Sequence, residues 1–150
     1  MATGLVKYSQ SLAGTLLAAR EAVMAPIRPI LRASNVTEQQ WRVLRVLDDV
    51  EVLDASGIAE QALLYAPTVT RILRELVDRG LVVRRIDSND GRRSIISITK
   101  EGHHLVEETA SHTRLLLDAY TKAFGEQRLH DFIAEARMLA LALEPFQPER

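Results

Sequence analysis

Residues 67–98 combine an amphipathic helix with a β-hairpin, and this order restricts the folds open to the chain more than any other feature. Pro67 suits the first helical position and Gly80 suits the residue just after a helix, so the two bracket one helix. Spacings of three and four residues place its apolar side chains on one face: Val69, Ile72, Leu73, Leu76 and Val77. Two apolar, β-branched runs follow, joined by the turn Asp87–Arg93. The stretch predicts a helix that leads directly into a two-stranded hairpin.

Two shorter helices are predicted before this one. Thr37 and Gln40 have the spacing of a capping box, which predicts a helix over 38–48. Asp54 is a favourable N-cap residue for a second helix. Helix, helix, tight turn, helix and hairpin is the order of a winged helix-turn-helix, so we expect this lobe at about 37–99. The expected fold class is mainly α, with a small β-hairpin as the wing.

Long amphipathic helices are predicted on both sides of this lobe. The N-terminal pattern covers about 8–33 and contains two prolines, the first at Pro26, which predict a kink or break. The C-terminal pattern covers about 100–145, with a glycine inside it. The apolar positions exceed what one small lobe covers, so their natural partner is a second copy of the chain. We therefore expect a single domain over 1–150, with both flanking regions as dimerisation helices of a homodimer.

Composition excludes several classes of protein. No apolar run approaches the roughly 18 residues that cross a bilayer, and no signal-peptide pattern is present, so we expect a cytoplasmic protein with no membrane partner. The chain has no cysteine, which excludes disulfides, thiolate metal sites and cysteine-based sensing of oxidants. The four histidines are not spaced as metal ligands on adjacent helical turns, so we expect no metal and no cofactor.

Charge is unevenly distributed along the chain, although the formal net charge is only −1. Residues 67–100 hold eight basic and four acidic residues, so the predicted helix and hairpin form a positive module in a balanced chain. A weak total charge argues against indiscriminate binding of polyanions. A local positive surface is nevertheless what a nucleic-acid contact requires.

Three interpretations compete for the turn Asp87–Arg93. Its first residues resemble a calcium-binding EF-hand loop, but Ile98 stands where that loop needs a glutamate. The second interpretation is a solvated and inert hairpin tip. The third is a wing whose Arg92 reaches the narrow minor groove of DNA, with Asp90 holding its guanidinium in place. The basic helix directly before the hairpin favours the third.

These stretches resemble the MarR family of transcriptional regulators. The resemblance rests on the stretch 67–82, on the wing tip Asp87…Asp90-Gly91-Arg92, and on the exit Ile98-Thr99-Lys100-Glu101-Gly102, and the order of helices agrees over nearly the whole chain. Two departures are mild, with Ser88 where proline is common and Gly91 where an arginine is common. The resemblance implies a homodimeric repressor whose two recognition helices enter successive major grooves of a palindromic operator in double-stranded DNA.

The exposed face of the helix and the wing supply the candidate DNA contacts. Arginine binds guanine with two donors, and threonine offers a hydroxyl and a methyl group to bases or phosphates. The candidate DNA-binding residues are Pro67, Thr68, Thr70, Arg71, Arg74, Arg84, Asp90, Arg92 and Arg93. Because Arg84 and Arg85 alternate along a strand, only one of them is expected to face the duplex, and the other is free to pair with an acid.

The N-terminal half resembles the MarR regulators of homoprotocatechuate degradation operons, at 19–24, at Arg28-Pro29 and at 37–42. This resemblance implies a small aromatic acid as effector, bound where the dimerisation helices meet the DNA-binding lobe. Arg20 lies on an apolar stripe, where it either anchors a carboxylate or belongs to a snorkelling or inter-subunit ion pair. The candidate ligand-binding residues are Arg20, Met24, Arg28, Trp41 and Arg42.

Alternatives from other classes remain. A MarR-like regulator that responds to a different phenolic ligand fits the same pattern. A winged-helix module that binds proteins instead of DNA predicts an apolar or acidic face on the helix 67–79, whereas threonines and arginines occupy this face. An enzyme is not expected, because the sequence contains no nucleophile elbow, phosphate-binding loop or metal-spacing motif.

Overall fold

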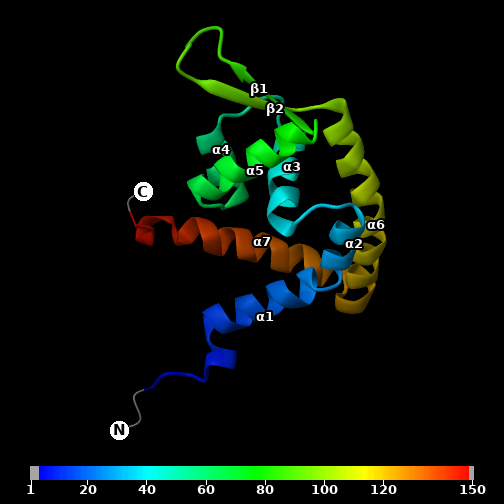
Figure 1. Cartoon of the computed structure of the whole chain (residues 1–150). Coiled ribbons are helices and arrows are strands. Elements are labelled where there is room, and N and C mark those ends of the chain that lie inside the picture. The colour runs from blue at the N-terminus through cyan, green and yellow to red at the C-terminus, as the bar shows by residue number, and fades with distance from the viewer. Residues whose placement is uncertain (1–3, 149–150) are drawn as a thin grey trace. The chain divides into compact units, whose positions relative to one another are not determined.

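The computed structural model describes residues 4–148, in which helices flank a single β-hairpin (Figure 1). The helices are α1 (Leu12–Met24), α2 (Ile27–Ala33), α3 (Glu38–Asp49), α4 (Ala55–Ala62), α5 (Ala66–Asp78), α6 (Lys100–Phe124) and α7 (Glu126–Ala142). The strands are β1 (Val82–Ile86) and β2 (Ser94–Ile98), and short 3-10 helices lie at Tyr8–Gln10 and Glu144–Phe146. The element order confirms the expected mainly α fold with a winged helix-turn-helix.

Capping determines where α3 and α4 begin. The Thr37 hydroxyl accepts a hydrogen bond from the Gln40 backbone N–H (3.1 Å), and the Gln40 side-chain oxygen accepts one from the Thr37 N–H (3.0 Å). The Asp54 carboxylate accepts a hydrogen bond from the Gly57 N–H at 2.9 Å and so begins α4. Both caps confirm the predictions from the sequence.

The N-terminal helical region is broken at the first proline, as expected. α1 ends at Met24 and α2 begins at Ile27, and Pro26 between them has no N–H with which to continue the hydrogen bonding of a helix. Pro29 is the third residue of α2, where a missing N–H has no consequence because the first turn of a helix has no internal acceptors for its donors. The two prolines therefore play different roles.

The boundaries of α5 agree closely with the sequence pattern. The helix begins at Ala66, so Pro67 is its second residue instead of its first, and Gly80 follows its end with φ of +71°. Val77 was expected on the buried face but is 39% exposed, because it lies at the edge of that face beside an open cleft. The other four apolar residues of the face are at most 1% exposed: Val69, Ile72, Leu73 and Leu76.

The hairpin is anchored to the helices at its base. β1 and β2 pair antiparallel from Val82 opposite Ile98 to Ile86 opposite Ser94. Leu53, directly before the Asp54 cap, forms an isolated antiparallel bridge with Ile96. The core beneath contains apolar side chains that are less than 2% exposed, each contributing roughly 1.5–3 kcal/mol by burial: Leu31, Leu44, Leu47, Ile58, Ile72, Leu73, Leu76 and Ile96.

The exit from the wing packs closely against the end of α5. The Thr99 hydroxyl donates to the Gly80 carbonyl (2.7 Å) and accepts from the Gly102 N–H (3.0 Å), which caps α6. A Cβ on Gly102 would lie 2.2 Å from the carbonyl oxygen of Leu81. Only glycine permits this approach, which gives the Thr-x-x-Gly motif a physical cause.

The chain contacts divide it into two compact units, one up to Thr113 and one from Arg114, and α6 continues through the boundary. In the second unit, Gly125 (φ +102°), the glycine inside the C-terminal pattern, separates α6 from α7. The rings of Phe124 and Phe132 pack edge to face across this break, with centroids 6.3 Å apart. Among residues 4–148, no helix has the length and apolar character needed to span a membrane.

Candidate DNA interface and candidate effector site

The exposed face of α5 presents most of the candidate DNA contacts. Thr70, Arg71 and Arg74 are exposed, whereas Thr68 is half-buried in the first turn. The Thr70 hydroxyl donates to the carbonyl of Ala66 at 3.3 Å. The exposed Arg71 guanidinium pairs with Glu75 one turn later at 2.8 Å.

A shallow cleft of about 150 Å³ lies between α5 and the wing. Arg84 of β1 lines it together with three polar residues of α5, namely Thr70, Arg74 and Asp78. Arg84 is therefore the strand arginine on the side of α5, and Arg85 alternates with it. Within residues 4–148 neither arginine forms an ion pair, so the acid partner considered for one of them is not found there.

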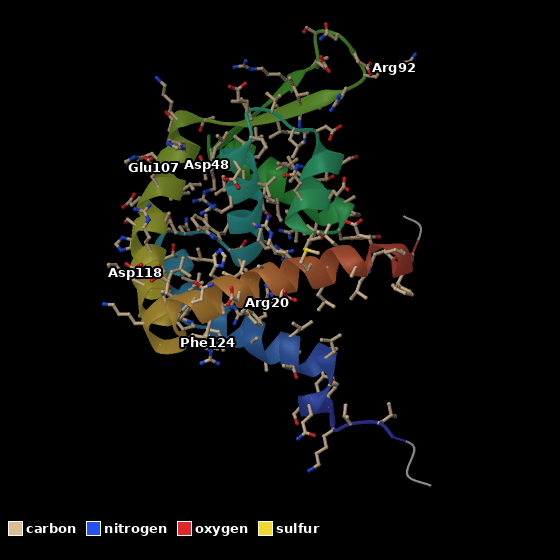
Figure 2. The ribbon with its side chains drawn as sticks, turned by 180° about the vertical axis from the view of Figure 1, so that it is seen from behind. Arg20, Asp48, Arg92, Glu107, Asp118 and Phe124 are labelled. Atoms are coloured by element: carbon tan, nitrogen blue, oxygen red, sulfur yellow. The ribbon has the colours of Figure 1, made fainter. Side chains whose placement is uncertain are left out.

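The tip of the wing is organised by its two aspartates. Asp87 accepts a hydrogen bond from the Asn89 N–H (3.0 Å), and Asp90 accepts one from the Arg92 N–H (3.1 Å). Asp90 was expected to hold the Arg92 guanidinium, and this expectation is corrected, because the carboxylate binds the backbone instead. Arg92 is exposed, and Figure 2 shows it at the outer end of the hairpin.

Arg93 occupies a different position from its neighbour in the turn. Its Nε atom donates to the Asp54 carboxylate at 3.1 Å, and this joins the wing to the beginning of α4. Half of the Arg93 side chain is nevertheless exposed, at 51%. The two adjacent arginines thus differ, since the guanidinium of Arg93 is held by an acid of the same lobe and that of Arg92 is not.

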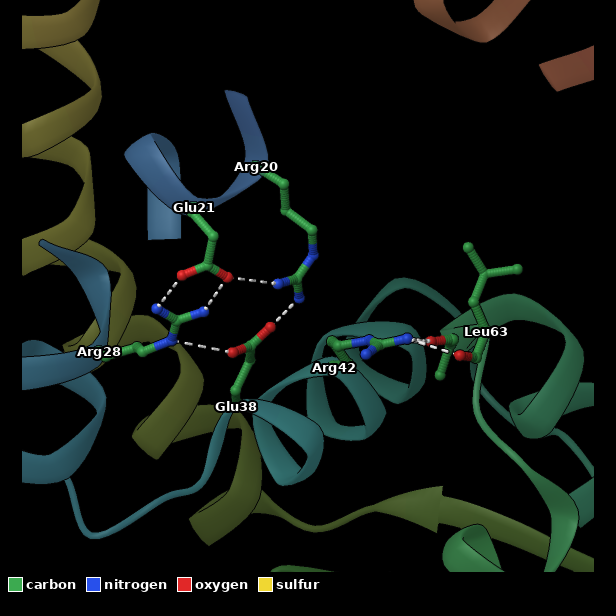
Figure 3. A network of polar contacts seen from close by, with 7 residues as sticks. Arg20, Glu21, Arg28, Glu38, Arg42 and Leu63 are labelled. Carbon is green, nitrogen blue, oxygen red and sulfur yellow. Dashed lines mark hydrogen bonds and ion pairs between the residues drawn. The ribbon is translucent and has the colours of Figure 1, made fainter. Parts of the chain in front are cut away.

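Two of the candidate ligand residues belong to a ring of alternating charges (Figure 3). Arg28 donates two hydrogen bonds to Glu21, at 2.9 and 2.8 Å, and one to Glu38 at 3.2 Å. Arg20 donates to Glu38 as well and lies 3.6 Å from Glu21. The ion pair of Arg20 therefore lies within one chain. The two acids balance the two arginines, and the hydrogen bonds from Arg28 hold the pKa of Glu21 below its usual range.

Arg42 is turned toward the end of α4, as Figure 3 shows. Its Nε donates to the carbonyl of Ala62 at 2.9 Å, and one terminal nitrogen donates to the carbonyl of Leu63 at 2.6 Å. Leu63 has φ of +53°, so Arg42 satisfies the last carbonyls of α4 where the chain turns toward α5. Burial lowers the pKa of Arg42, and the positive charge of Arg20 adds to this effect.

The remaining two candidates are half-buried. Met24 is the last residue of α1, and Trp41 lies in the first turn of α3 beside Arg42. The guanidinium of Arg45 lies 5.9 Å from the centroid of the Trp41 ring. The structure thus brings Arg20 and Arg28 into direct contact with one pair of acids, while Arg42 binds elsewhere.

Comparison with known proteins identifies the family of the chain. The MarR family model matches residues 36–94, which run from just before α3 to the start of β2. The HTH-type transcriptional regulator FarR of Neisseria gonorrhoeae is 40% identical over 131 residues, or 85% of this chain and 90% of that protein. This chain belongs to the MarR family.

Two further relatives of this MarR protein are connected with aromatic acids, one by its name and one by the ligand in its crystal structure. The homoprotocatechuate degradative operon repressor of Escherichia coli is 44% identical over 95 residues, which is 63% of this chain and 64% of that protein. The crystal structure of NadR in complex with 4-hydroxyphenylacetate matches with a TM-score of 0.77 and 39% identity, over 91% of this chain and 97% of that one. The MarR protein described here is thus a DNA-binding transcriptional regulator and not an enzyme.

Sequence reasoning missed the acidic members of both candidate sites in this MarR protein. Glu38 and Glu21 were not singled out, although both stand in the stretches that carried the resemblance. Glu75 of α5 was not among the candidates either, and it accepts a hydrogen bond from Gln40 of α3 at 2.9 Å. Asp48, which lies 2.6 Å from His103, was not considered either. Each acid has a partner on a different element, and local spacing does not reveal that partner.

Proposed function

We propose that this MarR regulator is a homodimeric repressor of an operon for aromatic-acid catabolism, and that a small aromatic acid such as homoprotocatechuate releases it from DNA. The observation that carries the DNA part of this proposal is the placement of Arg74 and Arg84 around one cleft, with Arg71 exposed on the same helix and Arg92 at the tip of the adjoining wing. A positive helix face next to a positive hairpin has the chemistry required by the major groove and the adjacent minor groove.

In this proposal α5 is the recognition helix. Arg71 and Arg74 read base edges, Thr68 and Thr70 contact bases or phosphates, and Pro67 shapes the first turn that approaches the duplex. Arg84 and Arg92 bind phosphate or minor groove from the wing. Asp90 and Arg93 act indirectly, Asp90 through the backbone of the tip and Arg93 mainly through its bond to α4.

The proposed dimer explains the apolar surface of the flanking helices, 8–33 and 100–145. α7 contains no residue that the described chain buries, yet six large apolar side chains in and after it are 38–79% exposed: Phe132, Ile133, Met138, Leu141, Leu143 and Phe146. On α1, Leu12, Leu16 and Leu17 are 40–60% exposed. Exposed apolar side chains in such numbers on one helix are commonly covered by a partner in soluble proteins, and a second copy presents the same helices.

The proposed effector site is the ring of Arg20, Glu21, Arg28 and Glu38, with Trp41 nearby on α3. An arginine held by a carboxylate has the geometry that a carboxylate ligand also needs. An aromatic acid would replace one of the two glutamates on Arg20 or Arg28, while Trp41 and Met24 offer apolar surface to its ring. Two relatives support this class of ligand, since one is named for homoprotocatechuate degradation and the other has a crystal structure in complex with 4-hydroxyphenylacetate.

Release from DNA would then be a shift between two conformations of the dimer. Glu38 is the first residue of α3, so a ligand that displaces it acts directly on the DNA-binding lobe. A ligand weakens DNA binding only by its difference in affinity for the two conformations. Such a ligand must therefore prefer the dimer whose recognition helices are wrongly spaced for the operator.

Fluorescence anisotropy tests this proposal. The probe is a duplex from the intergenic region upstream of the gene, compared with a scrambled duplex, with and without homoprotocatechuate or 4-hydroxyphenylacetate. We expect selective binding that either acid releases. Selective binding that neither acid affects would overturn the ligand class, and binding without selectivity would overturn the operator function.

The oligomeric state is tested on the same protein by light scattering during gel filtration. Ile133→Asp places a charge on the exposed apolar face of α7 and should convert a dimer to a monomer. Asn89→Asp adds the same charge to the wing and should leave the mass unchanged. A wild-type monomer would overturn the proposed dimer.

A further inference from the structure

Gln40 is a buried polar residue that connects two helices of the DNA-binding lobe. Gln40 is only 8% exposed, and its side-chain oxygen completes the capping box by accepting from the Thr37 N–H at 3.0 Å. The capping box needs only this oxygen. The side-chain nitrogen of Gln40 points elsewhere and donates a hydrogen bond to Glu75 on α5, at 2.9 Å.

Glu75 divides its two oxygens between a buried donor and an exposed one. Oε2 accepts from Gln40, and Oε1 accepts from the Arg71 guanidinium at 2.8 Å. The hydrogen bond from Gln40, followed by the one from Arg71, lowers the pKa of Glu75, so its carboxylate stays charged near neutral pH. A continuous series of bonds therefore runs from the cap of α3 to an arginine on the exposed face of α5.

Arg71 and Arg74 lie on the same helix face but are held differently. An exposed ion pair between residues four apart orders a long side chain only weakly by itself. Here the carboxylate is already oriented by a buried amide, which is itself fixed by the capping box. Within residues 4–148, no comparable ion pair holds Arg74. The pairing with Glu75 engages one terminal nitrogen of Arg71 and leaves other donors of the guanidinium for a base.

Orienting an arginine before binding matters for reading a base. A guanidinium that binds guanine with two parallel donors must adopt one orientation, and ordering a flexible side chain on binding costs affinity. When the guanidinium is already oriented, less affinity is lost in ordering it, and the difference in binding affinity between the right base pair and a wrong one is larger. The bonds of Gln40 and Glu75 provide such an orientation for Arg71.

We infer that Gln40 and Glu75 are positioning residues, which hold Arg71 in the orientation that reads one base pair of the operator. Selectivity at this base pair then depends on the N-terminal turn of α3, although neither Gln40 nor Glu75 needs to touch the DNA. This inference rests on the proposed function, because it requires that Arg71 reads a base.

Reversing the hydrogen bond provides a sharp test. Gln40→Glu keeps the capping box, in which glutamate is as usual as glutamine, but removes the donor to Glu75 and places two carboxylates together. Adding Glu75→Gln restores a bond of opposite polarity, in which residue 75 donates to residue 40 and still offers its oxygen to Arg71. Gln39→Glu is the matched control, because it makes the same change at the exposed neighbouring position of α3.

The measurement is a set of dissociation constants for each full-length variant. The probe is the tightest duplex that the wild-type protein selects from a random library, together with every single base-pair substitution of it. Arg71→Ala first identifies the base pair that Arg71 reads, where the wild type should discriminate by roughly tenfold or more. Gln40→Glu should reduce discrimination there to about twofold and leave it unchanged at base pairs read by other residues. The double variant should regain most of the discrimination at the base pair read by Arg71, and Gln39→Glu should discriminate as the wild type does.

The possible failures are distinguishable. If Gln40→Glu keeps full discrimination at that base pair, or loses it equally at all positions, the positioning role is wrong and the proposed function stands. A double variant no more selective than Gln40→Glu would also overturn the positioning role. If the wild type selects no sequence, or Arg71→Ala changes no position, the DNA-reading role of Arg71 fails and this inference fails with it.

Discussion

Arg93 in the wing donates a hydrogen bond to Oδ2 of Asp54 at 3.1 Å, while Oδ1 of the same carboxylate caps α4 at 2.9 Å. One side chain thus begins the helix before α5 and also holds the hairpin after it. Arg93 of the wing and Asp54 of the helix-turn-helix are 39 positions apart in the sequence. Their common attachment to Asp54 provides a physical reason for treating them as one reading surface.

The two functions of Asp54 can be separated by substitution. Asp54→Ala removes the cap and the ion pair, and we expect the free energy of unfolding to fall by about 1 kcal/mol or somewhat more. Asp54→Asn keeps a good cap and loses only the exposed ion pair, so we expect a loss within about 0.5 kcal/mol. Urea denaturation followed by circular dichroism measures both. Equal losses in the two variants would show that the ion pair outweighs the cap.

Arg92 is expected to contact DNA through its charge. Arg92→Ala should weaken binding to the operator and lower the slope of log K against log salt concentration by about 0.9, the value for one phosphate contact. Arg92→Lys retains the charge and should retain the slope. The measurement is anisotropy at several salt concentrations. An unchanged slope for Arg92→Ala would mean that the tip of the wing is an inert turn.

Arg20 is expected to act on the effector response and not on DNA binding itself. Arg20→Ala removes a guanidinium that donates to the Glu38 carboxylate in the proposed effector site, so we expect operator binding close to that of the wild type with little or no release by the aromatic acid. Arg114→Ala, which removes an exposed arginine of α6 outside the proposed effector site, is the matched control and should respond normally. Anisotropy with increasing ligand measures the response, and light scattering checks the dimer. A dimer that dissociates on Arg20→Ala would instead give Arg20 a structural role.

His103 and Asp48 predict a pH-dependent attachment of α6 to α3. Nδ1 of His103 lies 2.6 Å from Asp48, and its Nε2 lies 3.3 Å from Glu107. Both acids are labelled in Figure 2. The hydrogen bond and charge of Asp48 raise the pKa of His103 above its ordinary value of 6.5. Because the folded-state pKa is the higher one, the stabilisation is complete below the unfolded-state value and is lost as pH rises through the folded-state value.

This pH dependence is measured as the difference in unfolding free energy between the wild type and His103→Gln. The difference should be largest at pH 5.5 and should shrink as the pH rises above about 6.5. Asp48→Asn should remove most of the pH dependence, because it deletes the principal cause of the raised pKa. A difference that stays constant from pH 5.5 to 9 would contradict the assigned ion pair.

The caps and breaks of helices could be predicted because each depends on neighbouring atoms. The capping box of Thr37 and Gln40, the N-cap of Asp54 and the stop at Gly80 all involve groups no more than about four residues apart. The break after Met24 follows from a proline in the same segment. Sequence reasoning therefore recovered the order of elements and most of their ends.

Long-range partners could not be predicted in the same way. The Asp90 carboxylate had two donors within reach, the guanidinium and the backbone N–H of Arg92. The conformation of the folded turn determines that it accepts from the backbone N–H. Arg42 was a candidate for a ligand, yet it satisfies carbonyls at the end of α4, 20 and 21 positions away. Val77 fits the apolar face of its helix by spacing, but its exposure depends on where the neighbouring strand lies.

Local sequence was thus sufficient for the winged helix-turn-helix, for the positive character of α5 and the wing, and for the motifs of the MarR family, because each is recorded within a short stretch of chain. The pairing of charges required the tertiary structure. Arg20 finds Glu38, Arg93 finds Asp54 and Glu75 finds Gln40 only once separate helices approach each other. A charged side chain can reach any of several acids a few ångströms away, and packing of the apolar core determines which of them is near enough to bind.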